Sequence, residues 1–137
     1  MLSKLGKELL FFDGGMGTLL QKEGLLPGEL PENWNIEKKE VIRNIHRAYY
    51  EAGSNILITN TFGANRVKYH DAAYTLKQVI EAAVDNVKSV SDEVVVALDM
   101  GPTGKLLKPM GDLSFEDAKK ILEDNNFTDI VLSLKAS

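Results

Sequence analysis

Three short polar segments carry the residue types that could bind a small molecule. They are Asp13-Gly14-Gly15, Thr59-Asn60-Thr61 and Asp99. Because glycine has no Cβ, the backbone N–H groups of Gly14 and Gly15 can approach a ligand closely. A carboxylate beside exposed amides suits a zwitterion, with the amides facing its carboxylate and Asp13 facing its ammonium group. These seven residues are therefore the predicted substrate-binding set.

The same residues also suit purely structural roles. Asp-Gly-Gly is common in turns, and Thr-Asn-Thr can cap backbone groups. Asp99, close to Gly101 and Pro102, can shape a turn. His46 lies between the apolar positions of a predicted helix and is expected to be solvated or packed, and His70 lies in a predicted loop. Two separated histidines are weak evidence for a metal site.

Each polar segment directly follows a predicted strand. Apolar runs alternate with helical patterns, as in repeated βαβ units with a parallel sheet. The predicted strands are residues 9–12, 56–58, 94–98 and 130–134, and the predicted helices are 36–52, 75–90 and 114–125. Asn35 is expected to cap the first helix and Gly53 to end it. Functional groups in parallel α/β folds gather at the strand ends, so we expect the polar segments to share one rim.

This element order predicts an α/β fold. Four parallel strands and three helices correspond to an incomplete (β/α)₈ TIM barrel, since a complete one takes about 250 residues and this chain has 137. We expect residues 1–137 to form a single partial barrel. An open sheet of Rossmann type is the alternative. It would need G-x-G-x-x-G after its first strand, and Leu20 stands at the third glycine position.

Composition narrows the classes of partner and compartment. The net charge is −4 without a basic stripe, so neither nucleic acid nor an anionic membrane is an expected partner. The apolar run at residues 9–12 is too short for a secretory signal or a membrane span, which predicts a cytoplasmic protein. The chain contains no cysteine, so it can form neither a disulfide nor a thiolate metal site.

Three ordered segments resemble the homocysteine S-methyltransferase domain, in the version found as the N-terminal module of cobalamin-dependent methionine synthase. They are residues 11–18 (FFDGGMGT), 53–65 (GSNILITNTFGAN) and 99–104 (DMGPTG). The match covers roughly residues 5–118. The resemblance implies a barrel that binds homocysteine at its strand ends, where zinc held by three cysteines turns the substrate thiol into a thiolate. A corrinoid or another donor then supplies the methyl group.

The resemblance also implies roles for individual residues. Asp13 would hold the amino group of homocysteine, and the amides of Gly14 and Gly15 its carboxylate. The mouths of the second and third strands would be lined by Thr59, Asn60, Thr61 and Asp99. Because the chain has no cysteine, we expect no zinc, no other cofactor and no methyl transfer by this chain alone. Homocysteine binding is expected to be weak or absent.

Two other interpretations stay open. A four-strand half-barrel has two unpaired edges through which it could self-associate without catalysis, or the chain is a truncated or chimeric product without function. The tail, residues 119–137, is a candidate for foreign origin. Within it, residues 121–137 resemble a helix–strand unit of the iron–sulfur synthase that makes hydroxymethylbutenyl diphosphate, in which the lysine matching Lys135 would face the diphosphate.

Overall fold

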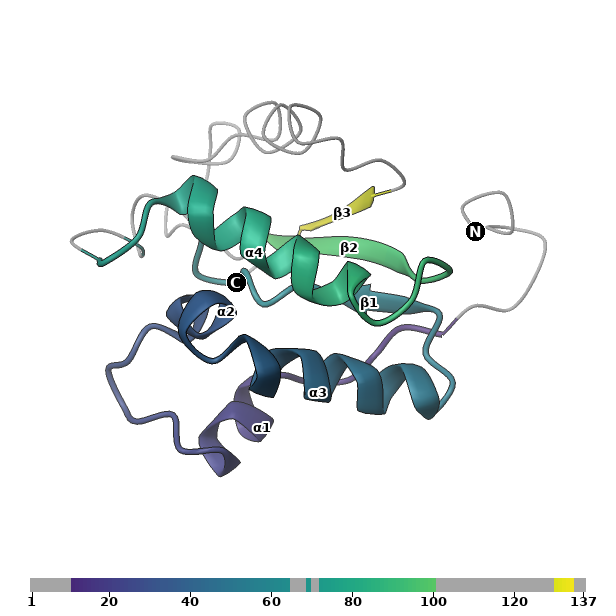
Figure 1. The fold of residues 1–137 in the computed structure, drawn as a ribbon, viewed down its shortest axis with the longest axis horizontal. Coiled ribbons are helices and arrows are strands. Elements are labelled where there is room, and N and C mark those ends of the chain that lie inside the picture. The colour runs from purple at the N-terminus through teal and green to yellow at the C-terminus, as the bar shows by residue number, and fades with distance from the viewer. Residues whose placement is uncertain (1–10, 65–68, 70–71, 101–129, 135–137) are drawn as a thin grey trace.

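The structure is a computed structural model that describes residues 11–64, 69, 72–100 and 130–134. Its elements, in chain order, are α1 (Gly17–Lys22), the 3₁₀ helix η2 (Pro31–Asn33), α2 (Trp34–Glu37), α3 (Lys39–Glu51), β1 (Ile56–Ile58), α4 (Leu76–Lys88), β2 (Val95–Met100) and β3 (Ile130–Leu134). Figure 1 shows α4 running along the sheet and α3 beside it. The predicted α/β class is confirmed.

The described strands form one parallel sheet in the order β1-β2-β3. Ile56 pairs with Val95, and Val96 pairs with Ile130. The predicted strands 56–58 and 130–134 are confirmed. The strand predicted at 94–98 is observed as β2, which begins one residue later and ends two residues later than predicted. The predicted strand at 9–12 is described only from residue 11 and makes a single parallel bridge, from Phe12 to Ile56. The prediction of four strands is therefore not confirmed.

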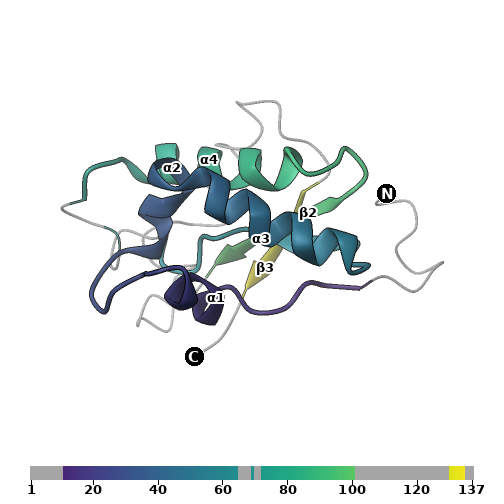
Figure 2. The same cartoon turned by 60° about the horizontal axis from the view of Figure 1, so that its bottom comes forward.

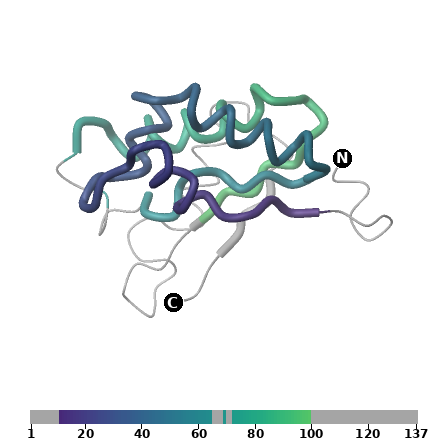
Figure 3. Tube along the Cα trace, turned by 90° about the horizontal axis from the view of Figure 1, so that it is seen from below, coloured from purple at the N-terminus to yellow at the C-terminus, as the bar shows by residue number. Residues whose placement is uncertain are grey.

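One face of the sheet is covered by helices. Figure 3 shows α3 and α4 on the same side of the strands. The buried residues of this layer are Leu57, Val96 and Leu98 from the sheet and Ile80, Val84 and Val87 from α4. A separate buried cluster joins Ile56, Val95 and Ala97, whose positions alternate with those of the first layer. Apolar side chains on both faces are typical of a parallel sheet, and they place the strand ends on a rigid support.

Helix α4 matches the prediction of a helix at 75–90. Thr75 forms a capping box in which its hydroxyl accepts from the Gln78 amide and the Gln78 side chain accepts from the Thr75 amide. These bonds satisfy two backbone donors at the helix start. The apolar positions of the helix then pack on the sheet, so local sequence and tertiary contacts agree.

The predicted helix at 36–52 is wrong in its start. The chain forms the short α2, leaves helical geometry at Lys38 (φ −133°, ψ 48°) and begins again as α3. Asn35 lies inside α2 rather than capping a helix, because its amide is engaged by Asn60. Gly53, at φ 112°, lies directly after the helix end as predicted. The fully buried residues of α3 are Ile42 and His46.

Helix α1 was not predicted. It is held by Leu20, which packs against Trp34 and Ile42, so its contacts come from residues far along the chain. Figure 2 shows α1 below α3 in that view. The predicted helix at 114–125, His70 and Lys135 lie outside the described residues. Among the helices that the structure describes, none is long and apolar enough to cross a membrane.

Candidate functional site

The seven predicted binding residues line one pocket. It has a volume of about 80 Å³ and lies where the chain leaves β1, beside the end of β2. We call it the strand-end pocket. Its described lining residues are Asp13, Gly14, Gly15, Met16, Ile58, Thr59, Asn60, Thr61, Phe62 and Asp99. Three segments separated by up to 86 positions in the sequence are thus brought together by parallel strand pairing.

Asp13 is fixed at the pocket by two hydrogen bonds to β1. Its backbone N–H donates to the Ile56 carbonyl at 3.1 Å. The Ile58 N–H donates to its carboxylate Oδ2 at 3.2 Å. Charge-assisted bonds of this kind are stronger than neutral ones. The carboxylate is therefore held at the end of β1 by the strand itself.

The two glycines lie beside Tyr49 of α3. The Tyr49 hydroxyl donates to the Gly15 carbonyl at 2.7 Å. A Cβ on Gly14 would lie 2.8 Å from Tyr49 Oη, whereas a Cβ on Gly15 would meet nothing within 4 Å. Gly14 is thus needed for close approach of the tyrosine, and the tyrosine holds the glycine segment that lines the pocket.

A closed circuit of hydrogen bonds joins β2 to the segment after β1. The Asp99 N–H donates to Thr59 Oγ1 at 3.1 Å, and the Thr61 hydroxyl donates to the Asp99 carbonyl at 2.6 Å. Since a hydroxyl has one hydrogen, the 2.7 Å contact between the two threonines must be donated by Thr59. Both hydroxyl hydrogens are therefore used inside the protein. The threonines line the pocket and also hold the Asp99 backbone in place.

The amide nitrogen of Asn60, a residue of the pocket lining, is hydrogen-bonded within the protein. Its Nδ2 donates to the Pro31 carbonyl at 2.9 Å and to Asn35 Oδ1 at 3.0 Å. The Asn35 Nδ2 returns a bond to the Asn60 carbonyl at 2.9 Å. Both amide hydrogens of Asn60 are thus engaged. Its side chain supports the pocket wall. These bonds agree with the alternative interpretation that Thr-Asn-Thr serves a structural role.

The charged side chains that line the pocket are both acidic. Asp13 and Asp99 are both in its lining, Asp99 is only 6% exposed, and the described lining contains no lysine, arginine or histidine. An acidic, partly desolvated site favours a cationic group such as an ammonium ion. Asp99 was expected just after its strand but lies inside β2, paired with Ser133.

Three lining residues were not among the predicted set. Met16, Ile58 and Phe62 add apolar surface, and Phe62 is 43% exposed. Each lies next to a predicted residue in sequence, which was the only signal available. Their side chains could contact the aliphatic part of a ligand.

Three other ionisable side chains of the described residues, those of Glu32, His46 and Tyr69, are buried outside the strand-end pocket. Burial lowers the pKa of His46 from 6.5 to about 4, and neither ring nitrogen has a hydrogen-bond partner among the described residues. His46 is therefore packed, and the alternative of a solvated side chain is wrong. Burial, with the charge of Glu32 next in weight, raises the pKa of Tyr69, whose hydroxyl donates to Asn33.

Comparison with known proteins now gives this pocket a family context. Residues 10–129 match the profile of the homocysteine S-methyltransferase family. The chain belongs to that family. The match includes all three segments of the strand-end pocket and continues past residue 118, where the resemblance was expected to end.

Curated relatives are consistent with this assignment. Methionine synthase of Mycobacterium leprae is 31% identical over 121 residues, which cover 77% of this chain and 10% of that protein. Betaine–homocysteine S-methyltransferase 1 of Bos taurus is 34% identical over 93 residues, covering 63% of this chain and 23% of its own length. This chain therefore spans less than a quarter of either relative.

Solved structures with the same fold include the homocysteine methyltransferase MmuM of Escherichia coli. Its oxidised form superimposes with a TM-score of 0.64 at 25% identity, covering 73% of this chain and 40% of that chain. Its metallated form gives a TM-score of 0.75 at 20% identity, covering 97% and 56%. The arrangement of strands and helices described above is thus that of an established fold.

The zinc site that the family resemblance implies does not fit these residues. The chain has no cysteine to supply thiolates. The described ranges also contain no cluster of three or more His, Asp or Glu side chains that could hold a metal ion. No chemical step on a metal can therefore be assigned to the residues that the structure describes.

Proposed function

We propose that this chain forms the amino-acid-binding part of a homocysteine S-methyltransferase site within an incomplete (β/α)₈ barrel. The observation that carries the proposal is the convergence of Asp13, the two glycines and Asp99 on one acidic pocket at the strand ends. Strand carboxyl ends are the usual place for binding sites in such folds.

The pocket suits the charged end of an α-amino acid. Asp13, held by the Ile58 amide, faces the ammonium group, and the exposed segment at Gly14 and Gly15 offers backbone N–H groups to the carboxylate. Asp99 adds negative charge on the ammonium side. With about 80 Å³ of space, the pocket holds a head group rather than a whole methyl donor.

Homocysteine binding by the chain alone is proposed to be weak. One charged contact and a few amides correspond to a dissociation constant of about 1 mM. Titration with homocysteine, followed by ¹⁵N NMR, should shift the amides of Gly14, Gly15 and Ile58 and leave those of α4 unchanged. Shifts spread over the whole chain, or none at tens of millimolar ligand, would contradict the proposal.

Methyl transfer is not proposed for this chain by itself. Sulfur alkylation needs a thiolate, and a metal-bound thiol is deprotonated at neutral pH. Without cysteine ligands the chain cannot supply that activation. An assay of methionine formation with homocysteine and methylcobalamin should give no turnover above the protein-free rate. Turnover by the purified chain would refute this part.

A second candidate function is self-association without catalysis. Phe11 and Phe12 run beside β1, an outer strand of the described sheet, and are 54% and 55% exposed. Apolar residues at a sheet edge favour pairing with another chain. Light scattering after size-exclusion chromatography should then report a dimer, and Phe12→Lys should restore the monomer. A monomer at all concentrations would exclude this candidate.

A further inference from the structure

The strand-end pocket is supported from behind by buried amide side chains. Asn35, Asn60 and Asn86 are 1%, 6% and 1% exposed. Burying an amide without partners is costly, so such groups are retained when their hydrogen bonds are made. Here they are made with each other and with backbone carbonyls.

Asn35 is the junction of this network. Its Nδ2 donates to the carbonyls of Asn60 (2.9 Å) and Val79 (3.2 Å), and its Oδ1 accepts from Asn60. Its own carbonyl accepts from Asn86 Nδ2 at 3.0 Å. One residue of α2 thereby ties the segment after β1 to both ends of α4.

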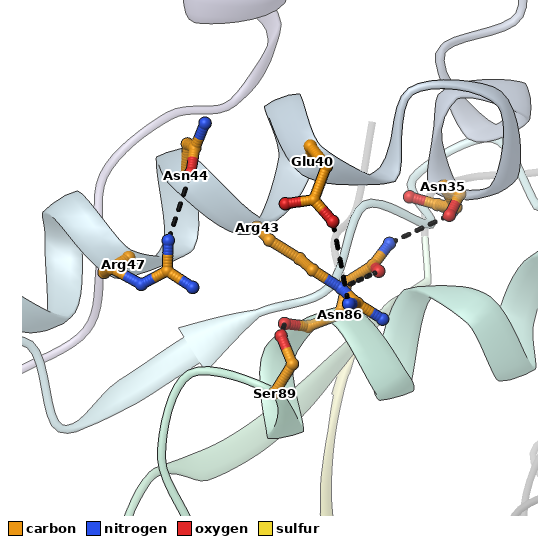
Figure 4. A network of polar contacts seen from close by, with 7 residues as sticks. All are labelled: Asn35, Glu40, Arg43, Asn44, Arg47, Asn86 and Ser89. Carbon is orange, nitrogen blue, oxygen red and sulfur yellow. Dashed lines mark hydrogen bonds and ion pairs between the residues drawn. The ribbon is translucent and has the colours of Figure 1, made fainter.

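The network continues to the surface of α3. Figure 4 shows Asn86 between Asn35 and Arg43, and Arg43 extending toward Glu40. The Arg43 Nε donates to Asn86 Oδ1 at 2.9 Å, and Arg43 lies 3.9 Å from the Glu40 carboxylate. The orientation of the Asn86 amide is therefore fixed on both sides, which in turn fixes the backbone of Asn35.

We propose that Asn35 is a positioning residue for the strand-end pocket. Through its reciprocal amide pair with Asn60 it holds the segment 59–61, and through the threonine circuit that segment holds the backbone of Asp99. The inference rests on the proposed function, because the pocket is taken to be a ligand site. Asn35 itself does not line the pocket.

The first test needs no ligand. In Asn35→Ala, hydrogen exchange at the amides of Thr59 and Asp99 should accelerate by about tenfold or more relative to the Val84 amide in α4, because the loop loses its buried partner. Val87→Ala provides a matched control, since it opens a cavity in the core without touching the network. It should accelerate all three amides together.

The second test measures homocysteine by NMR titration in the same variants. Asn35→Ala should weaken binding by about tenfold or more, whereas Val87→Ala, with a similar fall in melting temperature, should not. Exposed Asn44, whose side-chain oxygen accepts from Arg47, offers a further control as Asn44→Ala. If Asn35→Ala does not fold, Asn35→Ser, which keeps one donor, replaces it in both tests.

The outcomes separate the two proposals. Equal acceleration of exchange at all three amides overturns the positioning role, as does selective acceleration without loss of affinity. If the unmodified chain shows no homocysteine binding, the proposed function fails. The hydrogen-exchange test in Asn35→Ala is then the one that decides whether Asn35 positions this loop, through faster exchange at Thr59 and Asp99 only.

Discussion

Asp13 combines a structural bond with a charge that faces the pocket. Its Oδ2 accepts the Ile58 amide, an interaction that an asparagine oxygen can also make. Asp13→Asn should therefore keep the fold while removing the negative charge. We expect homocysteine affinity to fall by about tenfold or more, since hydrogen bonds to charged groups contribute about 1.5–3 kcal/mol.

NMR titration of Asp13→Asn measures this directly, with exposed Asp92→Asn as the control for net charge. The melting temperatures of both variants should stay close to that of the parent chain. An unchanged affinity in Asp13→Asn would mean that the ammonium group binds elsewhere, with Asp99 the next residue to substitute.

His46 makes the stability of the fold depend on pH. Its pKa is about 4 when folded and 6.5 as the ordinary value. The unfolded chain therefore binds more protons between these values, and stability falls as pH decreases through this window. Between pH 7 and pH 5 the loss is about 2 kcal/mol.

Chemical denaturation at several pH values measures this loss. In His46→Leu, an apolar side chain of similar size, the part of the pH dependence between 6.5 and 4 should disappear. If parent and variant lose the same free energy of unfolding, other groups cause the acid sensitivity.

The residue types at the pocket could be predicted from sequence, but their hydrogen-bond partners could not. Asp13 and Thr59 follow apolar segments that pair in the sheet, as predicted, whereas Asp99 lies inside β2 rather than after it. The Asn60 amide turns to Pro31 and Asn35, which lie 29 and 25 positions away. Such partners depend on how helices pack, and nothing in a local pattern encodes them.

At the scale of elements, the approach of α3 to the first loop depends on Gly14. A Cβ there would lie 2.8 Å from Tyr49 Oη and 3.0 Å from Cε1, so the ring would have to move and release the Gly15 carbonyl. Gly14→Ala should destabilise the protein by about 1–3 kcal/mol, as overpacking does.

Thermal unfolding of Gly14→Ala tests this, with Gly15→Ala as a matched control. A methyl group at Gly15 meets nothing within 4 Å, so the control should stay within about 0.5 kcal/mol of the parent. Equal losses in both variants would indicate that loss of backbone freedom, rather than contact with Tyr49, sets the cost.

Elements with strong local signals were predictable, and those shaped by tertiary contacts were not. Helix α4 has both a capping box and a continuous apolar face. The break at Lys38 has no glycine or proline to mark it. Asn35 has the residue type of a helix cap, yet its side chain serves the network behind the pocket, so the helix start was misplaced.

For the whole molecule, the family assignment and the amino-acid content of the chain point in different directions. The chain matches a family whose chemistry requires an activated thiol, and it has no cysteine with which to bind a metal. The strand-end pocket can recognise an ammonium and a carboxylate. None of its described residues is suited to distinguish a thiol from a thioether.

Ligand selectivity should therefore follow the amino-acid head group alone. Homocysteine and methionine share that group, so we expect their dissociation constants for this chain to agree within about threefold, a difference of less than about 1 kcal/mol.

Zinc or a chelator should leave both dissociation constants unchanged, because the sulfur contacts no metal here. Competition titrations with and without EDTA measure both effects, and 4-mercaptobutyrate, which lacks the amino group of homocysteine, is the control expected not to bind. Zinc-dependent preference for homocysteine would show that the chain assembles a metal site from residues other than cysteine.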